Sequence, residues 1–162
     1  MSFERSGEEL AGTPARERAS EVLGRIAAAL GLDVEVRTEE DADQVTAEYV
    51  GDDLGPLIGH HGAMIDAVQH LTYRIVFHGR EDRKRISVDA AGYRERRAQT
   101  LRALGDQAAE SAVRERRPVA LEPMSASERR VVHEHLKSRF DVETYSEGQE
   151  PSRRLVVAPL VD

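Results

Sequence analysis

The order of apolar and polar residues predicts a helix and then two strands at the start of the chain. Apolar residues recur at helical spacing after the Thr-Pro pair at 13–14, which suits an N-cap and first turn, and Gly31 ends that helix. Alternation at 32–36 and 45–49 predicts two strands, and the acidic stretch at 38–43 predicts the hairpin tip between them.

Three further elements are predicted before residue 90. Residues 52–58 suit one or two helical turns, and a helix with an apolar face begins at Ala63 and stops near Gly79. The run RISV at 85–88 predicts a third strand, because Ile and Val favour a pleated sheet.

The pattern changes after residue 90. A long helix is predicted over 91–116, and Ser125 with Glu128 has the capping-box spacing that opens another helix. Two strands then form a closing hairpin. These strands span 142–146 and 153–157, and the residues expected to face the core are Val131, Val132, Leu136 and Phe140.

Composition fits a soluble globular protein, and the predicted order of helices and strands fits the α+β class. Hydrophobic residues make up 40% and charged residues 33%, and no apolar run approaches the roughly 20 residues of a membrane span. The absence of cysteine excludes disulfides, thiolate metal sites and a cysteine nucleophile. The acidic start MSFERSGEEL does not resemble a secretory signal, so we expect a cytoplasmic location and a flexible N-terminus over residues 1–13.

The net charge of -7 is unevenly distributed. Residues 1–58 carry 14 acidic and 5 basic residues, whereas residues 59–162 carry 16 acidic and 18 basic ones. A single basic cluster usually marks a solvated face, but several leave room for a basic surface. The clusters lie at 83–85, 94–97, 114–117, 129–130 and 153–154.

The segment Gly59-His60-His61-Gly62 lies directly before the helix that begins at Ala63. Glycine at both ends removes Cβ atoms, so a phosphate backbone can approach the main chain while the first N–H groups of the helix point toward it. A GxxG sequence also suits a simple helix start, and only its context can separate the two interpretations.

That context resembles a type II KH domain, with the order αββααβ over residues 14–90. The resemblance implies that the loop clamps about four nucleotides of single-stranded RNA, or of single-stranded DNA. Aromatic residues make up only 4% of the chain, too few for the stacking platforms of other nucleic-acid folds. Candidates for an aliphatic groove are Ile58, Met64 and Ile65, each of which also suits the core. Asp in place of Gly62 is expected to abolish the clamp with the fold largely intact.

A second motif lies in the sequence SERRVVHEHL. Arg129 and His133 are four residues apart on one helical face, with Arg130 beside them and Lys137 one turn further on. Together they offer several hydrogen-bond donors to phosphate oxygens, although an Arg and a His at this spacing also suit an ordinary surface.

The spacing resembles that of the small single-stranded nucleic-acid-binding Arg-x-x-x-His (R-3-H) domain, and VETYSEGQEPSRRLVV resembles its closing hairpin. A KH domain at 14–90, a connecting helix at 91–116 and this domain at 117–160 resemble the layout of the bacterial Jag (SpoIIIJ-associated) family. The larger N-terminal domain of many members has no counterpart in these residues. The chain thus resembles a short form of the family.

The resemblance implies an RNA-binding protein, acting as an RNA chaperone or post-transcriptional regulator with a small single-KH-domain partner. In that family the role is linked to cell elongation, division and envelope synthesis. It implies no cofactor, no metal and no small-molecule substrate.

Two other function classes compete with RNA binding. A protein-interaction module that forms a homodimer through the KH domain is favoured by the missing basic residues of the loop. An enzyme is disfavoured, because the chain has no nucleophile elbow and no P-loop lysine. Its histidines also lack a carboxylate or cysteine partner at metal-ligand spacing.

The middle positions of the loop lead to a testable prediction. Many KH loops carry Lys or Arg there, whereas imidazole, with an unperturbed pKa of about 6.5, is mostly neutral at pH 7. If His60 and His61 contact phosphate, protonation strengthens binding, so affinity for RNA should rise when the pH falls from 8 to 6. A flat titration would mean that the histidines only tolerate the tight turn.

Overall fold

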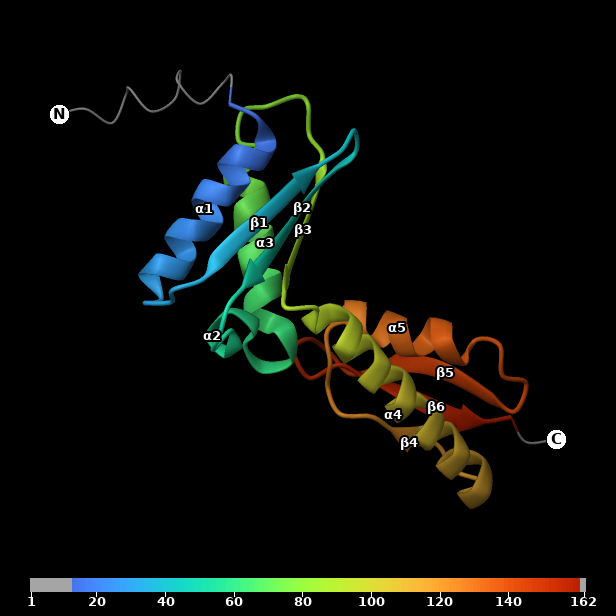
Figure 1. The fold of residues 1–162 in the computed structure, drawn as a ribbon. Helices are drawn as coiled ribbons and strands as arrows, with labels where there is room; N and C mark the ends of the chain where they lie inside the picture. Colours follow the sequence, from blue (N-terminus) through green and yellow to red (C-terminus); the bar gives the residue numbers. More distant parts are fainter. Residues whose placement is uncertain (1–12, 161–162) are drawn as a thin grey trace. The chain divides into compact units, whose positions relative to one another are not determined.

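The computed structural model describes residues 13–160, so the flexible N-terminus expected at 1–13 lies outside the described residues apart from Thr13. The chain divides after Arg94 into a first unit, Met1–Arg94, and a second unit, Glu95–Asp162 (Figure 1). Among residues 13–160 no helix has both the length and the apolar character that a bilayer span requires. The elements of the first unit are α1 (Ala15–Ala29), β1 (Glu35–Glu40), β2 (Gln44–Val50), α2 (Gly55–Ile58), the short 3-10 helix η2 (His60–Gly62), α3 (Ala63–Val76) and β3 (Arg85–Ala90).

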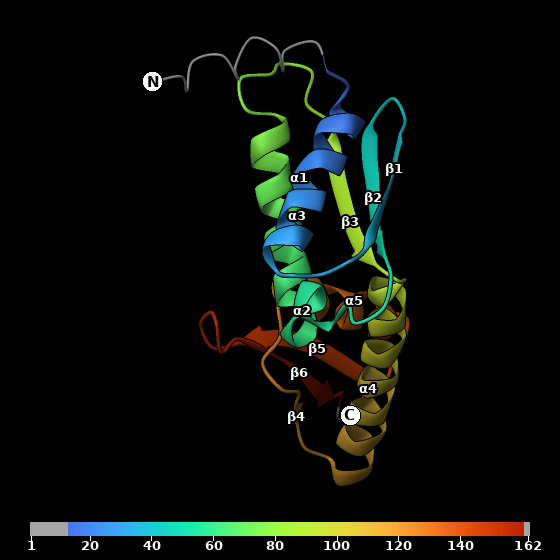
Figure 2. The ribbon, with the colours of Figure 1, turned by 60° about the vertical axis from the view of Figure 1, so that its left-hand side comes forward.

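The first unit packs two helices on one face of a three-stranded sheet. The strand order is β1-β2-β3, with β1 antiparallel to β2 and β2 parallel to β3. Helices α1 and α3 lie side by side over the sheet (Figures 1 and 2). Alternate residues of β2 and β3 face these helices and form the core, which is what the alternating pattern predicts. They are Val45, Ala47, Tyr49, Ile86, Val88 and Ala90.

Two long-range hydrogen bonds attach α1 to the rest of this unit. The buried Tyr49 hydroxyl donates to the carbonyl of Leu23 at 2.8 Å, and burial raises the pKa of that hydroxyl. The Arg18 guanidinium donates to the carbonyl of Ile75 at 3.1 Å, in the last turn of α3. Both bonds satisfy polar groups that the apolar core would otherwise leave without partners.

The hairpin tip is shorter than the predicted acidic loop at 38–43. Strand β1 continues through Glu40, and the turn consists of residues 41–43, where Asp41 Oδ1 accepts the N–H groups of Asp43 and Gln44, both at 2.8 Å. Glu40 stays in the strand, where it pairs with Val45 of β2, and its carboxylate accepts a hydrogen bond from Lys84 at 2.8 Å, which lowers the pKa of Glu40. The acidic composition therefore does not end the strand.

The second unit packs two helices against another three-stranded sheet, in the antiparallel order β4-β6-β5. Ser125 and Glu128 form the predicted capping box at the start of the second helix. Because each unit contains both helices and strands, the expected α+β class is confirmed. The elements are α4 (Tyr93–Glu115), β4 (Val119–Ala120), α5 (Ala126–Leu136), β5 (Val142–Glu147) and β6 (Arg154–Pro159).

Two features of this unit differ from the sequence expectations. The helix expected to connect two domains over 91–116 corresponds to α4, and its buried face belongs to the core of the second unit. Phe140, expected in the core, is 94% exposed. It lies in the loop after α5, where its neighbours Arg139 and Asp141 pair with each other at 2.6 Å. The shared core includes Leu101, Ala108, Ala109 and Ala112 of α4 together with Val132, Leu136, Leu155 and Val157.

Candidate nucleic-acid interface

The GxxG segment forms a tight turn between α2 and α3 in which three residues have positive φ. These are Gly59 (φ 70), His61 (φ 51) and Gly62 (φ 80). A Cβ atom on Gly59 would lie 2.7 Å from Met64 Cβ and 2.9 Å from the backbone nitrogen of Met64. Glycine is therefore required at this position, because the chain passes directly against the first turn of α3.

Gly62 is fixed by a residue from a distant part of the sequence. It is buried, and a Cβ atom there would lie 2.9 Å from Cε1 of the Tyr93 ring. The structure argues against the expectation that Asp at Gly62 leaves the fold largely intact, because the new side chain would overlap the ring in a left-handed backbone conformation.

The two histidines supply the side chains of the turn. His60 is exposed and His61 half-buried, and their rings stack with centroids 3.9 Å apart. Asp66, in the first turn of α3, is held by Arg94 at 2.7 Å. The turn therefore offers a ligand two imidazoles at the start of α3, where the N–H group of Ala63 already donates to the carbonyl of His60.

The three groove candidates separate into two groups. Met64 is 39% exposed and Ile58 is half-buried, so both remain accessible beside the turn. Ile65 is fully buried in the core of the first unit, because its position on α3 faces the sheet. The assignment of Ile65 to the groove is therefore wrong.

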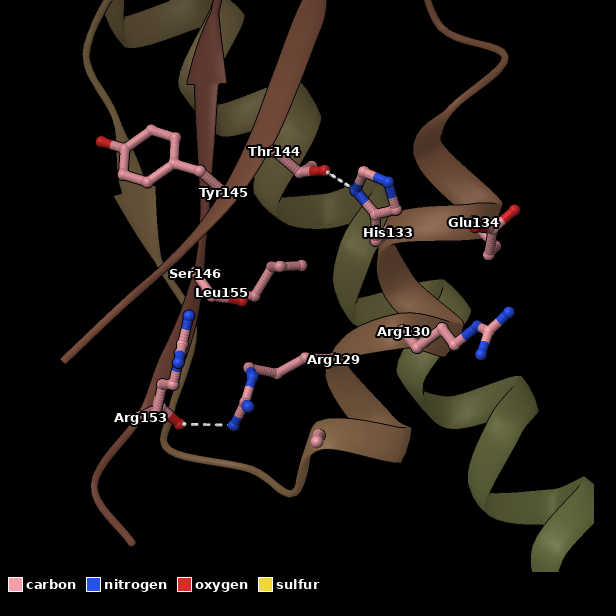
Figure 3. Close-up of a pocket in the computed structure, with 10 residues that line it drawn as sticks. Arg129, Arg130, His133, Glu134, Thr144, Tyr145, Ser146, Arg153 and Leu155 are labelled. Atoms are coloured by element: carbon pink, nitrogen blue, oxygen red, sulfur yellow. Dashed lines mark hydrogen bonds between the residues drawn. The ribbon is translucent and has the colours of Figure 1, made fainter. Parts of the chain in front are cut away.

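Arg129 in the second unit is a buried residue with internal partners. Its guanidinium donates to the carbonyl of Met124 at 2.6 Å and to Glu150 Oε1 at 2.7 Å. It also donates to the carbonyl of Arg153 at 3.5 Å (Figure 3). Only 8% of its side chain is exposed. Arg129 thus ties the start of α5 to the loop between β5 and β6, and most of its donors are used in doing so.

Arg130 and His133 line an open cavity of about 550 Å³ between α5 and the hairpin. His133 Nδ1 lies 2.5 Å from the Thr144 hydroxyl, and the Arg130 side chain points away from the strands (Figure 3). Lys137 does not line the cavity and lies beside Glu134 at 3.8 Å. The lining residues are Ala126, Arg129, Arg130, His133, Glu134, Thr144, Tyr145, Ser146, Arg153 and Leu155.

Sequence reasoning did not assign the strand residues of this cavity to the site. Thr144, Ser146 and Arg153 lie in the hairpin that was noted only as a closing element. Arg153 belongs to one of the basic clusters, and that cluster was the available signal. Three arginines, one of them the internally bonded Arg129, and a histidine line the cavity beside Glu134, and such a group can bind an anion such as a phosphate. Within residues 13–160 no group of three or more His, Asp or Glu side chains is placed to hold a metal ion.

Comparison with known protein families matches both units. The KH domain of KhpA/KhpB matches residues 17–89, and the Arg-x-x-x-His (R-3-H) domain matches residues 99–159. The second match begins inside α4, which agrees with the packing of that helix in the second unit. The two expected domain types are thus confirmed.

Three similar proteins are each named RNA-binding protein KhpB. The one from Clostridium symbiosum is 34% identical over 145 residues, covering 88% of this chain and 65% of that protein. The one from Bacillus subtilis is 30% identical over 144 residues, covering 88% of this chain and 69% of that protein. The one from Lactiplantibacillus plantarum is 38% identical over 104 residues, covering 64% of this chain and 32% of that protein. The chain therefore spans about two thirds of the first two relatives and about one third of the third.

The contact between Gly62 and Tyr93 can be tested by stability measurements. Gly62→Ala should lower the free energy of unfolding by about 2–5 kcal/mol, since a left-handed alanine costs about 1–2 kcal/mol and overpacking about 1–3 kcal/mol. Gly79→Ala is the matched control, because Gly79 also has positive φ (69) but nothing within 4 Å of the added Cβ. Equal losses for the two variants in urea denaturation would contradict the ring contact.

Proposed function

The chain belongs to the KhpB family of RNA-binding proteins, and on that premise we propose that it binds single-stranded RNA through both units. The observation that carries the proposal is the left-handed glycine turn of the first unit, which lies directly before α3 and presents the exposed His60 and the half-buried His61. In this proposal Gly59, His60, His61 and Gly62 form the clamp, with Ile58 and Met64 beside it.

The second contact is the cavity between α5 and the closing hairpin. Arg130, His133 and Arg153 contact phosphate oxygens there, and Lys137 adds charge one turn along α5. Arg129 serves mainly as a positioning residue, since its bonds to the hairpin loop fix the place of Arg153. Contacts of this kind fix the strand without reading its sequence.

Two modest sites on one chain can bind one strand far more tightly than either alone, because the second binding event becomes intramolecular.

We extend the proposal to the role implied by the Jag resemblance. The chain then acts as an RNA chaperone or post-transcriptional regulator with a small single-KH-domain partner, in cell elongation, division and envelope synthesis. The family is one of RNA-binding proteins rather than enzymes.

A second candidate function is a protein-interaction module that dimerises through the KH domain. The observation that favours it is a group of exposed apolar residues on α3, namely Met64, Leu71 and Ile75, which are 39–48% exposed. A stable dimer that purifies free of nucleic acid would support this candidate over RNA binding.

Binding of a fluorescent 12-nucleotide RNA, measured by anisotropy at two salt concentrations, tests the proposed function. The duplex and the DNA of the same sequence serve as comparisons. Salt-sensitive binding that favours the single strand supports the proposal. No binding at low salt contradicts it for the isolated chain.

The clamp is tested by replacing both loop histidines. His60→Asp with His61→Asp should weaken RNA binding about tenfold or more, because like charges brought together at an interface cost several kcal/mol. Asp tolerates the positive φ of position 61, so the fold should persist. Ala28→Glu with Ala29→Glu is the matched control, since it adds the same charge at exposed positions of α1. A loop variant that binds like the control would refute the clamp.

The different roles of the two adjacent arginines in α5 can also be measured. Arg130→Ala should leave the unfolding free energy unchanged and reduce the salt slope of RNA binding by about 0.7, the value for one single-strand phosphate contact. Arg129→Ala should lower the unfolding free energy by about 1–3 kcal/mol, because it removes the buried hydrogen bond to the carbonyl of Met124 and the bond to Glu150. The reverse outcome, a stable Arg129 variant with a reduced slope, would make Arg129 the phosphate ligand.

A further inference from the structure

A second, smaller cavity lies at the C-terminal end of α3, at the opposite end of that helix from the glycine turn. Its volume is about 140 Å³, and its floor includes the aromatic pair Tyr73 and Phe77, with ring centroids 5.4 Å apart. Three basic side chains and no carboxylate complete the lining. The lining residues are Tyr73, Arg74, Phe77, His78, Gly79 and Arg83.

Basic residues at the end of a helix often serve only to complement its dipole and to bind its last carbonyls. Here that role is filled from α1, because Arg18 donates to the carbonyl of Ile75. Arg74 and His78 have no side-chain partner among residues 13–160, and Arg83 uses only Nε, which donates to the carbonyl of Arg80 at 3.1 Å. These three side chains therefore keep donors available to an external ligand.

The neighbouring charges are already paired. Arg80 binds Asp82 at 2.5 Å and lowers the pKa of that carboxyl to about 2, so both side chains remain charged and paired with each other. Lys84 binds Glu40 at 2.8 Å. The acidic residue nearest in sequence without such a pair is Glu81, which is exposed and does not line the cavity. The charged side chains without an ion-pair partner at this end of α3 are therefore mainly positive, although the whole chain is acidic.

The exposed side of α3 connects the turn to this cavity. Met64, Leu71 and Ile75 lie on one side of the helix at spacings of seven and four residues, and all three are partly exposed. The 14 residues of α3 span about 21 Å at 1.5 Å per residue. About six nucleotides cover that length at the duplex rise of 3.4 Å, and fewer do so in an extended strand. A strand clamped at the turn can thus reach the cavity.

We propose that this cavity is a further contact for the RNA strand held by the turn, with Arg74, His78 and Arg83 binding a phosphodiester group and Tyr73 contacting the adjacent base. The inference rests on the proposed function. It supplies, one helix length away, the guanidinium groups that the His-His turn lacks. A guanidinium forms paired hydrogen bonds with phosphate, and an aromatic ring stacks with any base, so the site is not selective for sequence.

The test uses the full chain with Arg74→Ala and Arg83→Ala combined, and RNAs of 4 and 12 nucleotides. For the 12-nucleotide RNA the salt slope should fall by about 1.4, the value for two single-strand phosphate contacts. The 4-nucleotide RNA, which fits within the clamp, should bind with nearly unchanged affinity. Arg25→Ala with Arg37→Ala is the matched control, because both arginines are exposed in the first unit, on α1 and β1. Arg74→Ala alone, expected to reduce the slope by about 0.7, replaces the double variant if losing the Arg83 bond unfolds the chain.

The outcomes separate this inference from the proposed function. If the unaltered chain binds no RNA, both fail. If it binds RNA and the Asp variant of the turn does not, but the Arg74 and Arg83 variant behaves like the control, only the cavity contact is overturned. An unchanged slope together with a loss of self-association in sedimentation would also overturn it, because the same face would then be a protein interface.

Discussion

The left-handed turn at Gly59–Gly62 is the constraint on which the proposed RNA site depends. Its two glycines are held from opposite directions, since Met64 of the next helix passes against Gly59 and the ring of Tyr93 covers Gly62. Tyr93 packs on the core of the first unit, although it lies 31 residues after Gly62 in the sequence. The fold thus fixes the backbone shape of the turn, and the ligand need not order it.

The arginines of this chain divide into those that hold the fold and those that remain open. Arg18, Arg94 and Arg129 each donate to groups on other elements, and Arg97 pairs with Glu128 at 2.7 Å. These bonds fix α3, the start of α4 and the hairpin loop of the second unit. The net charge therefore says little about binding, which depends on the few basic side chains that the fold leaves without partners.

The sequence predicted the order of the elements well because periodicity, capping and glycine turns are local signals. The capping box at Ser125 and the turn before Ala63 needed only a few neighbouring residues to be recognised. The predictions for Ile65 and Phe140 failed for a different reason. Both residues are apolar, and their positions in the sequence fit a groove for Ile65 and a core for Phe140. Only the packing shows that Ile65 faces the sheet and that Phe140 projects from a loop.

The sequence by itself therefore determined the two domain types, the element order and the position of the glycine turn, since each depends on residues close together in the chain. The tertiary structure decided which charged and aromatic side chains are engaged inside the fold and which remain accessible. The Arg129 guanidinium is engaged inside the fold, because it donates to groups up to 24 positions away. Arg153 joins the cavity because β6 and its preceding loop return beside α5. Such contacts join residues that are distant in the chain, and no local pattern encodes them.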